Sequence, residues 1–134
     1  PMRVCGPVKA TIYAASSATD TDWTVMLLDV HPGGYAQRLN DGIVRARFRK
    51  SRERETWLTP GQVEAYDIDV WATCQTLLPG HRLRVDVSSS ADPKWDPNMN
   101  TGGVLGRETK GIPADQRIYH DRAHASRILI PVLP

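Results

Sequence analysis

Residues 81–90 read HRLRVDVSSS, and this stretch decides the fold class. Its apolar residues Leu83, Val85 and Val87 alternate with arginine, aspartate and serine. Successive side chains of a β-strand point to opposite faces, so a period of two is typical of a strand with one buried face. The turn-forming pair Pro79-Gly80 comes just before it. The sequence therefore predicts a half-buried strand that begins after a tight turn.

The same period recurs earlier in the chain. Residues 7–16 (PVKATIYAAS) alternate in this way, and residues 62–73 (QVEAYDIDVWAT) do so with one slip near Tyr66 that predicts a β-bulge. Residues 23–30 (WTVMLLDV) are nearly all apolar and end before the turn formers Pro32-Gly33-Gly34. That composition indicates a central strand that enters a turn.

The remaining strands complete an all-β pattern. Asp41-Gly42 favours a hairpin turn between residues 35–39 and 43–49. Residues 117–119 and 127–132 add two short strands, which makes about eight at spacings typical of an antiparallel sandwich or barrel. No segment has helical periodicity. We predict a two-sheet antiparallel sandwich whose core includes Ile12, Leu27, Val44, Val85, Val87 and Ile128.

Length and composition limit the classes of protein that remain. The length of 134 residues predicts one β-sandwich domain over residues 1–134, and 40% hydrophobic residues exclude intrinsic disorder. No run of about 18 apolar residues and no signal-peptide-like start are present, so we expect no membrane partner and a cytoplasmic location. The net charge of +2 is far from the strong positive field of nucleic-acid-binding domains, so no nucleic-acid partner is expected.

The two cysteines, Cys5 and Cys74, stand far apart in the sequence. Two cysteines make neither a disulfide framework nor a metal cluster. We expect two free thiols in a reducing compartment, with one long-range disulfide as the alternative.

Residues 91–116 interrupt the strand pattern with a segment dense in Asp, Pro, Asn and Gly. A structureless loop longer than about 12–15 residues is uncommon, so this one is expected to bind something or to rest on a neighbour. The spacing of Asp96, Asn98 and Asn100 is similar to the start of a calcium loop, but Gly102 and Glu108 each come one position late. We expect Asx turns around Asp92, Asp96, Asn98 and Asn100 to hold the loop, without a metal.

No catalytic motif is complete in this chain. G-x-S-x-G is absent, and Ser88-Ser89-Ser90 ends a strand with no helix after it. His120 and His124 imitate the zinc-binding spacing of H-E-x-x-H, which aligns two ligands only on a helix, and His81 is interpreted as a turn residue. The basic run at 45–55 is interleaved with glutamate and is interpreted as a charged strand edge. We therefore expect no catalytic, cofactor-binding or metal-binding residue.

Ordered short motifs run along nearly the whole chain: DTDW (20–23), LDVHPGG (28–34), DGIVRAR (41–47), PGHR (79–82), SSS (88–90), DPNMNTGG (96–103), and His120 with HAS (124–126) before Ile130-Pro131. Together they resemble the C-terminal domain of the X-Pro dipeptidyl-peptidase, cocaine esterase and glutaryl acylase family of serine hydrolases. One departure is Ala125, where relatives commonly have proline.

The resemblance implies a jelly-roll β-sandwich, galactose-binding-domain-like, that packs against an α/β-hydrolase catalytic domain carrying a Ser-His-Asp triad. It implies that this chain alone is not an enzyme, that the start of the domain is missing, and that the parent hydrolyses an acyl ester or amide. A homo-oligomer is a further expected partner. On the long loop, Trp95 and Met99 are expected to contact a neighbouring domain.

A free-standing carbohydrate-binding jelly roll is the alternative function. Trp57, Trp71 and Trp95 could stack on sugar rings, although fold analogy alone supports this weakly. A binding module should expose two or more tryptophans on one face, whereas a docking domain should bury them or place them at an apolar patch.

Overall fold

The computed structural model describes residues 1–134 as two antiparallel β-sheets with a single turn of 3-10 helix. The elements are β1 (Met2–Ser16), β2 (Asp22–Val30), β3 (Ala36–Arg45), η1 (Ala46–Phe48), β4 (Glu64–Leu77), β5 (Arg82–Ser88), β6 (Gln116–Tyr119), β7 (Arg127–Leu129) and β8 (Val132–Leu133). One sheet has the order β3-β2-β5, and in the other β1 pairs with β4 and with the short strands β6, β7 and β8. The predicted all-β sandwich of about eight antiparallel strands is confirmed.

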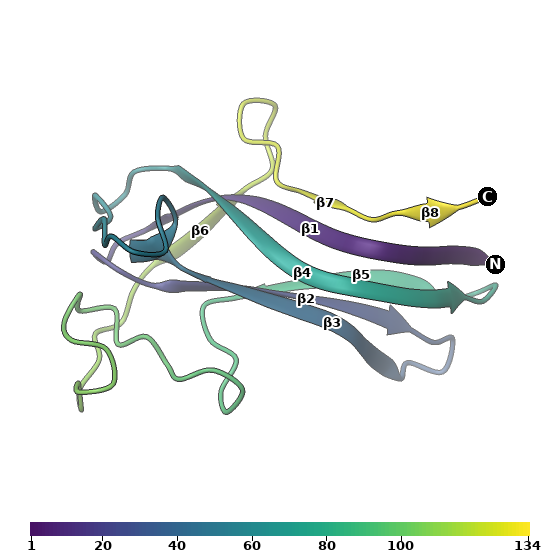
Figure 1. The fold of residues 1–134 in the computed structure, drawn as a ribbon, viewed down its shortest axis with the longest axis horizontal. Helices are drawn as coiled ribbons and strands as arrows, with labels where there is room; N and C mark the ends of the chain where they lie inside the picture. Colours follow the sequence, from purple (N-terminus) through teal and green to yellow (C-terminus); the bar gives the residue numbers. More distant parts are fainter.

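The two sheets lie face to face, most loops lie at the two ends of the sandwich, and the β6–β7 loop projects from its side (Figure 1). Both termini lie at one end, with the β2–β3 and β4–β5 turns. The opposite end carries η1 and the long segment between β5 and β6. The chain thus builds one compact end with short turns and one end rich in loops.

The core lies between β1, β2 and β4. Val8, Ala10, Ile12 and Ala14 of β1 and Trp23, Val25 and Leu27 of β2 are buried, as the period of two predicts. β2 is flanked by hydrogen-bonded strands on both sides and is buried along almost its whole length, which confirms the predicted central strand. The rings of Trp23 and Tyr66 join the two sheets, with centroids 5.8 Å apart.

The six predicted core residues divide into three groups. Ile12 and Leu27 are fully buried, and Val44, Val87 and Ile128 are half-buried against the core. Val85 is 39% exposed, so its assignment to the core is wrong. The alternation of β5 is nevertheless right, because Leu83 and Val87 on the same face pack inward. Val85 is exposed because β5 is an edge strand beside an opening between the sheets.

The predicted hairpin turn at Asp41-Gly42 is also wrong, because β3 runs straight through these residues. The real hairpin turn is His31–Tyr35, closed by the His31 N–H donating to the Tyr35 carbonyl at 2.8 Å. A Cβ at Gly42 would lie 2.0 Å from the Asp69 carbonyl oxygen, so glycine is needed where β4 approaches closely. The side-chain amide of Asn40 donates to the carbonyls of Val70 and Ala72, which are also in β4. Asn40-Asp41-Gly42 therefore forms a contact between the two sheets instead of a turn.

The β-bulge predicted in the fourth strand exists but lies nearer its end. The register between β1 and β4 shifts between Pro7 and Lys9, opposite Val70 and Trp71. Trp71 has a φ of 61°, and its N–H is bonded to the Asp69 carboxylate at 2.8 Å. The side chain of Trp71 is consequently directed outward and is 69% exposed.

The expected pair of free thiols is wrong, because Cys5 and Cys74 form a disulfide. The two residues are direct partners in the antiparallel register of β1 and β4. Their separation of 69 residues in sequence hides this proximity, which only the strand pairing creates. No helix of this chain is long and apolar enough to cross a membrane.

Candidate docking site

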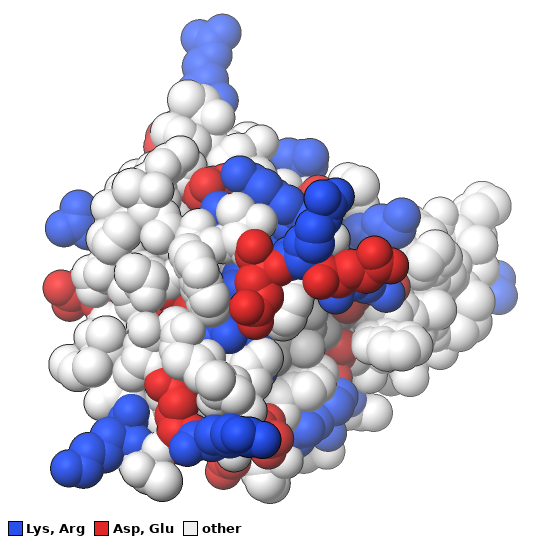
Figure 2. Space-filling view, turned by 60° about the vertical axis from the view of Figure 1, so that its left-hand side comes forward, with Lys and Arg blue, Asp and Glu red and all other residues white.

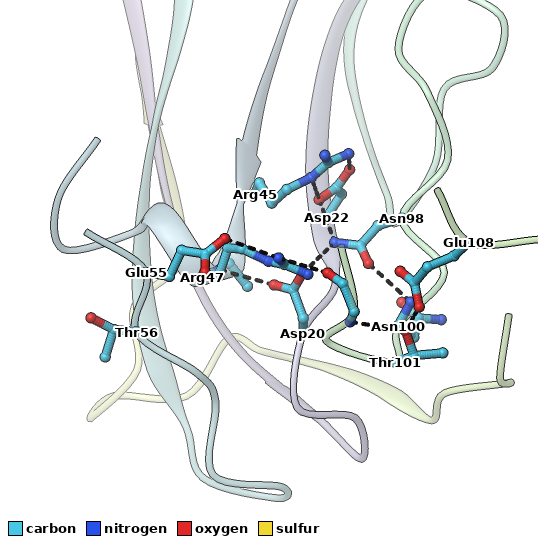
Figure 3. A network of polar contacts seen from close by, with 12 residues as sticks. Asp20, Asp22, Arg45, Arg47, Glu55, Thr56, Asn98, Asn100, Thr101 and Glu108 are labelled. Carbon is cyan, nitrogen blue, oxygen red and sulfur yellow. Dashed lines mark hydrogen bonds and ion pairs between the residues drawn. The ribbon is translucent and has the colours of Figure 1, made fainter. Parts of the chain in front are cut away.

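A buried ion-pair network organises the loop-rich end of the sandwich (Figure 3). Asp20 accepts from the Arg47 guanidinium at 2.7 Å and from the Arg47 backbone N–H at 2.9 Å. Both side chains are at most 2% exposed. Asp22 and Arg45 form a second, bidentate pair with two bonds of 2.8 Å. Two carboxylates at the start of β2 therefore face two guanidinium groups, one at the end of β3 and one in η1.

Strand pairing explains this placement, because Asp22 and Arg45 are direct partners in the β2–β3 register. Arginine suits the position better than lysine because its planar fork matches both carboxylate oxygens. The hydrogen bond to Asp22 raises the pKa of Arg45 above its already high ordinary value. Arg45 is thus charged whenever the protein is folded.

The long loop between β5 and β6 is fastened to this network by Asn98. The Asn98 amide donates to Asp20 at 2.8 Å and to Asp22 at 2.9 Å. Arg45 and Arg47 donate to the loop carbonyls of Asp96 and Gly103 at 3.1 and 3.0 Å. The loop is therefore held to the end of the sandwich by tertiary hydrogen bonds.

The predicted Asx turns account for only a small part of this order. Asn98 accepts from the Asn100 N–H at 2.9 Å, which is the expected turn. Asp92, Asp96 and Asn100 make no such bond, so that part of the prediction is wrong. The Asn100 amide instead donates to the Ile112 carbonyl, across the loop. Acceptors distant in sequence therefore take the side-chain amide donors of Asn98 and Asn100.

Trp95 and Met99 are both half-buried on this loop. The Lys94 ammonium lies 4.6 Å from the centroid of the Trp95 ring. The Met99 carbonyl accepts from the Ile112 N–H at 3.0 Å, and a Cβ at Gly111 would lie 3.3 Å from the Met99 sulfur. The backbone that carries both side chains is therefore ordered by its own contacts.

The basic run at 45–55 forms no basic stripe, and its interpretation as a charged strand edge is wrong, because β3 ends at Arg45 and η1 and a loop follow. Arg47 and Arg49 are turned inward, where Arg49 donates to the Thr56 carbonyl at 2.6 Å and to Glu64 at 2.9 Å. Figure 2 shows positive and negative side chains interleaved over the face that it presents. Phosphate groups would meet no continuous basic surface there.

The Arg49–Glu64 pair makes the stability of the sandwich sensitive to acid. The Arg49 hydrogen bond holds the pKa of Glu64 below its ordinary value. A carboxylate with a lowered folded pKa contributes stability above its unfolded pKa, and that stability is lost as the pH falls through the folded pKa. We expect Glu64→Gln to cost about 1–2 kcal/mol at neutral pH, with the difference from wild type shrinking below about pH 4.5.

Urea unfolding from about pH 7 to about pH 3 measures this difference. Glu53→Gln is the matched control, because Glu53 is exposed and forms no ion pair. A gap between Glu64→Gln and wild type that stays constant over this pH range would contradict the assignment.

The remaining sequence candidates lie apart from one another. Ser88 ends β5, and its carbonyl accepts from the Thr24 hydroxyl. His124 lies 3.0 Å from Asp121 in the β6–β7 loop and lowers the pKa of that carboxyl by hydrogen bonding. His120 is in the same non-helical loop, so the zinc-motif alignment does not form. His81 lies at the β4–β5 turn, as expected.

Asp121, His124 and Ser126 are close in sequence, but the Ser126 hydroxyl does not contact the His124 ring. The Ser126 hydroxyl donates to the Tyr119 carbonyl at 2.7 Å and accepts from the Tyr13 N–H at 2.9 Å. The first bond holds the β6–β7 loop to the end of β6, and the second holds it to β1. Ser126 thus has backbone partners in place of an imidazole base.

An open apolar cleft lies between the two sheets beside β5. Its volume is about 200 Å³. Aliphatic side chains from both sheets dominate its lining, among them Ile12, Val25, Val85, Val87, Ile118 and Ile128. Such aliphatic side chains are usually buried in a core, yet this cleft is open to solvent. The sequence carries no signal for the cleft, because alternation assigns the same aliphatic side chains to a closed core.

Of the three tryptophans that could stack on sugars, Trp57 and Trp71 are 44% and 69% exposed, and Trp95 is half-buried. The Arg47 guanidinium lies 4.3 Å over the Trp57 ring, and the Lys94 ammonium covers Trp95. Trp71 projects separately from the β4 bulge, and the apolar cleft contains no tryptophan. The carbohydrate-binding module stays the alternative prediction, and it requires Trp57 and Trp71 to act on one face.

Comparison with known proteins gives consistent matches over the whole chain. The family of the X-Pro dipeptidyl-peptidase C-terminal non-catalytic domain matches residues 1–129. A cocaine esterase of a Rhodococcus species is 44% identical over 135 residues, which cover 99% of this chain and 24% of that protein.

Two solved structures have the same fold. An α-amino acid ester hydrolase is similar with a TM-score of 0.92 and 30% identity, over 98% of this chain and 24% of its own. An aminopeptidase of a marine sediment Thaumarchaeota archaeon is similar with a TM-score of 0.89 and 32% identity, over 99% of this chain and 24% of its own. The chain spans about a quarter of the length of these relatives.

Proposed function

Because this chain belongs to the family of X-Pro dipeptidyl-peptidase C-terminal non-catalytic domains, we propose that it is the β-sandwich docking domain of a larger serine hydrolase. Residues 1–134 form one domain of that parent and pack against its α/β-hydrolase catalytic domain. The parent acts on an acyl ester or amide by Ser-His-Asp acyl transfer, in keeping with the esterase, ester hydrolase and aminopeptidase names of its relatives.

The open apolar cleft is the observation that carries this proposal. Val85 lies in its lining and is 39% exposed, although its strand alternates as a core strand does. Covering apolar surface contributes roughly 25 cal/mol per Å² removed from water, so a cleft of this kind favours a covering segment. About three quarters of each relative lies outside the matched region and can provide one.

The long loop provides a second contact with the catalytic domain, through Trp95 and Met99. Asn98 ties the loop to Asp20 and Asp22, so its backbone is ordered before docking. A preorganised loop avoids part of the entropy loss on association. Half-buried aromatic and thioether side chains are suited to the centre of such an interface.

We further propose that the parent hydrolase is a cytoplasmic homo-oligomer that binds neither nucleic acid nor a membrane. Cellular reductants keep thiols reduced there, so Cys5 and Cys74 would form their disulfide on later oxidation. Alkylation of fresh lysate before exposure to air measures this. A disulfide already complete at that point would place the protein in an oxidising compartment.

We expect the isolated chain to show no esterase or aminopeptidase activity, because acyl transfer needs a nucleophile, a base and oxyanion donors assembled together. Hydrolysis of p-nitrophenyl acetate by purified chain is the measurement, with and without a serine-directed inhibitor. Inhibitor-sensitive turnover by the pure chain would contradict the proposal.

Docking is tested in the parent protein. Reading the coding sequence upstream of Pro1 should reveal G-x-S-x-G, the signature of the expected nucleophile. Val85→Asp should then lower the thermal midpoint of the parent more than that of the isolated chain, because only the parent covers the cleft. Val132→Asp is the control, since Val132 is 57% exposed on β8, outside both the lining of the cleft and the long loop. Equal effects of Val85→Asp in both proteins would contradict docking through the cleft.

A further inference from the structure

Three metal-ligating side chains meet at the end of the sandwich opposite the ion-pair network. Asp29 is the second-to-last residue of β2, His31 follows β2 directly, and His81 comes directly before β5. β2 and β5 are antiparallel neighbours with Val30 opposite Arg82, so the pairing brings the two histidines together from 50 residues apart. The site is independent of the proposed docking function.

Short turns hold both histidine backbones. The His31 carbonyl accepts from the Gly34 N–H at 2.9 Å, and the His81 N–H donates to the Leu78 carbonyl at 3.1 Å. Gly80 has a φ of 84°, a conformation that favours glycine, and a Cβ there would lie 3.3 Å from the Pro32 ring. The two turns therefore pack against each other and place both imidazoles over one carboxylate.

The potential ligand atoms form a tight group. His81 Nδ1 lies 2.9 and 3.0 Å from the two Asp29 carboxylate oxygens, and His31 Nε2 lies 3.8 Å from Oδ2. The imidazole centroids are 4.3 Å apart, and one ligand atom from each residue lies within 4.8 Å of the others. The side chains of Asp29 and His81 are 9% and 11% exposed.

His31 Nε2 has no partner in this arrangement. The atom is buried and makes no hydrogen bond, although it faces the Asp29 carboxylate. Buried polar atoms in native proteins are nearly always satisfied. An ion between His31, His81 and Asp29 would satisfy this nitrogen.

We propose that Asp29, His31 and His81 bind a divalent transition-metal ion, with Zn²⁺ as the best match and water as a fourth ligand. Two imidazole nitrogens and one carboxylate oxygen suit zinc, whereas calcium and magnesium prefer oxygen ligands alone. Ligand atoms about 2.0–2.1 Å from a tetrahedral zinc lie about 3.3 Å from one another. The observed 2.9 and 3.8 Å lie on either side of that value, and the three ligand atoms lie within 4.8 Å of one another, so metal binding requires His31 to move inward.

Such an ion would link the β2–β3 turn to the β4–β5 turn. Both turns close the compact end of the sandwich, where the termini also lie (Figure 1). Zinc at this position would take the place of the hydrogen bond between His81 Nδ1 and the Asp29 carboxylate.

The test is a calorimetric titration of untagged, chelator-treated chain with ZnCl₂, supported by the visible absorption of bound Co²⁺. We expect one Zn²⁺ per chain. His31→Gln should raise the dissociation constant by at least about 10-fold, because loss of a direct ligand should exceed the loss of an outer-shell partner. His124→Gln is the matched control, since His124 also lies beside an aspartate.

His31 makes no side-chain hydrogen bond, so His31→Gln is expected to fold, which the thermal midpoint in chelator verifies. Proton NMR of the wild-type histidine rings provides a second measurement, in which Zn²⁺ should shift His31 and His81 and leave His120 and His124 unchanged. Absence of Zn²⁺ binding, unchanged affinity in His31→Gln, or an equal loss in His124→Gln would overturn the proposal.

Discussion

Replacing Asp20 by alanine is expected to lower the free energy of unfolding by about 3–5 kcal/mol, because it leaves the buried Arg47 guanidinium without its main counter-ion. Arg47 is 1% exposed, so water cannot replace the lost carboxylate. Its contacts with Glu55 and the Gly103 carbonyl, each at 3.0 Å, compensate only in part. The same substitution removes one of the two carboxylates that hold Asn98.

Urea unfolding at neutral pH measures the effect. Asp86→Ala is the matched control. The Asp86–Arg84 ion pair has a similar N–O distance, 2.9 Å, but both of its side chains are about half exposed. Exposed pairs contribute about 0–1 kcal/mol. Limited proteolysis should also cleave the loop at 91–116 faster in Asp20→Ala than in Asp86→Ala. Similar losses in the two variants would show that burial of the Asp20 pair has no special role.

Loss of the Cys5–Cys74 disulfide is expected to destabilise the oxidised protein by about 4 kcal/mol. The bond closes a loop of 69 residues, and in the chain-entropy account a long loop removes much freedom from the unfolded chain. Cys5 is half-buried and Cys74 is exposed, so serine at both positions adds little desolvation. The whole difference should therefore reflect the cross-link.

Unfolding of wild type and the Cys5→Ser/Cys74→Ser double variant, each with and without dithiothreitol, separates the cross-link from the side chains. Reductant should bring wild type to the stability of the double variant and leave the double variant unchanged. Reduced wild type that remains as stable as oxidised wild type would contradict the expectation.

The strand pattern was predictable because it is local. A period of two in β1, β4 and β5, and the continuous apolar run of β2, depend on neighbouring residues alone. The ordered motifs carried the family resemblance in the same way, and the match over residues 1–129 confirmed it. Alternation also placed Ile12 and Leu27 correctly in the core.

The candidate sites depended on residues that are distant in sequence. Asp20 meets Arg47 and Asn98 across separations of 27 and 78 positions, and Asp29 meets His81 across 52. No local signal marks those pairs, because they form only when β2 pairs with β3 and β5 and the long loop folds back onto the start of β2. The motif DTDW was visible, but the partners of its carboxylates were not.

By itself, the sequence determined the all-β class, the alternation of faces and the family, since these depend on chemistry between residues a few positions apart. The tertiary structure alone decided that Asp41-Gly42 continues a strand, that Cys5 and Cys74 are bonded, and that Val85 borders an open cleft. The physical reason is that β-sheet pairing and sheet packing join segments that are distant in sequence. Asp41-Gly42 stays extended because β4 approaches its backbone closely, and the two cysteines bond because β1 pairs with β4. Val85 is exposed because β5 has a neighbouring strand on one side only.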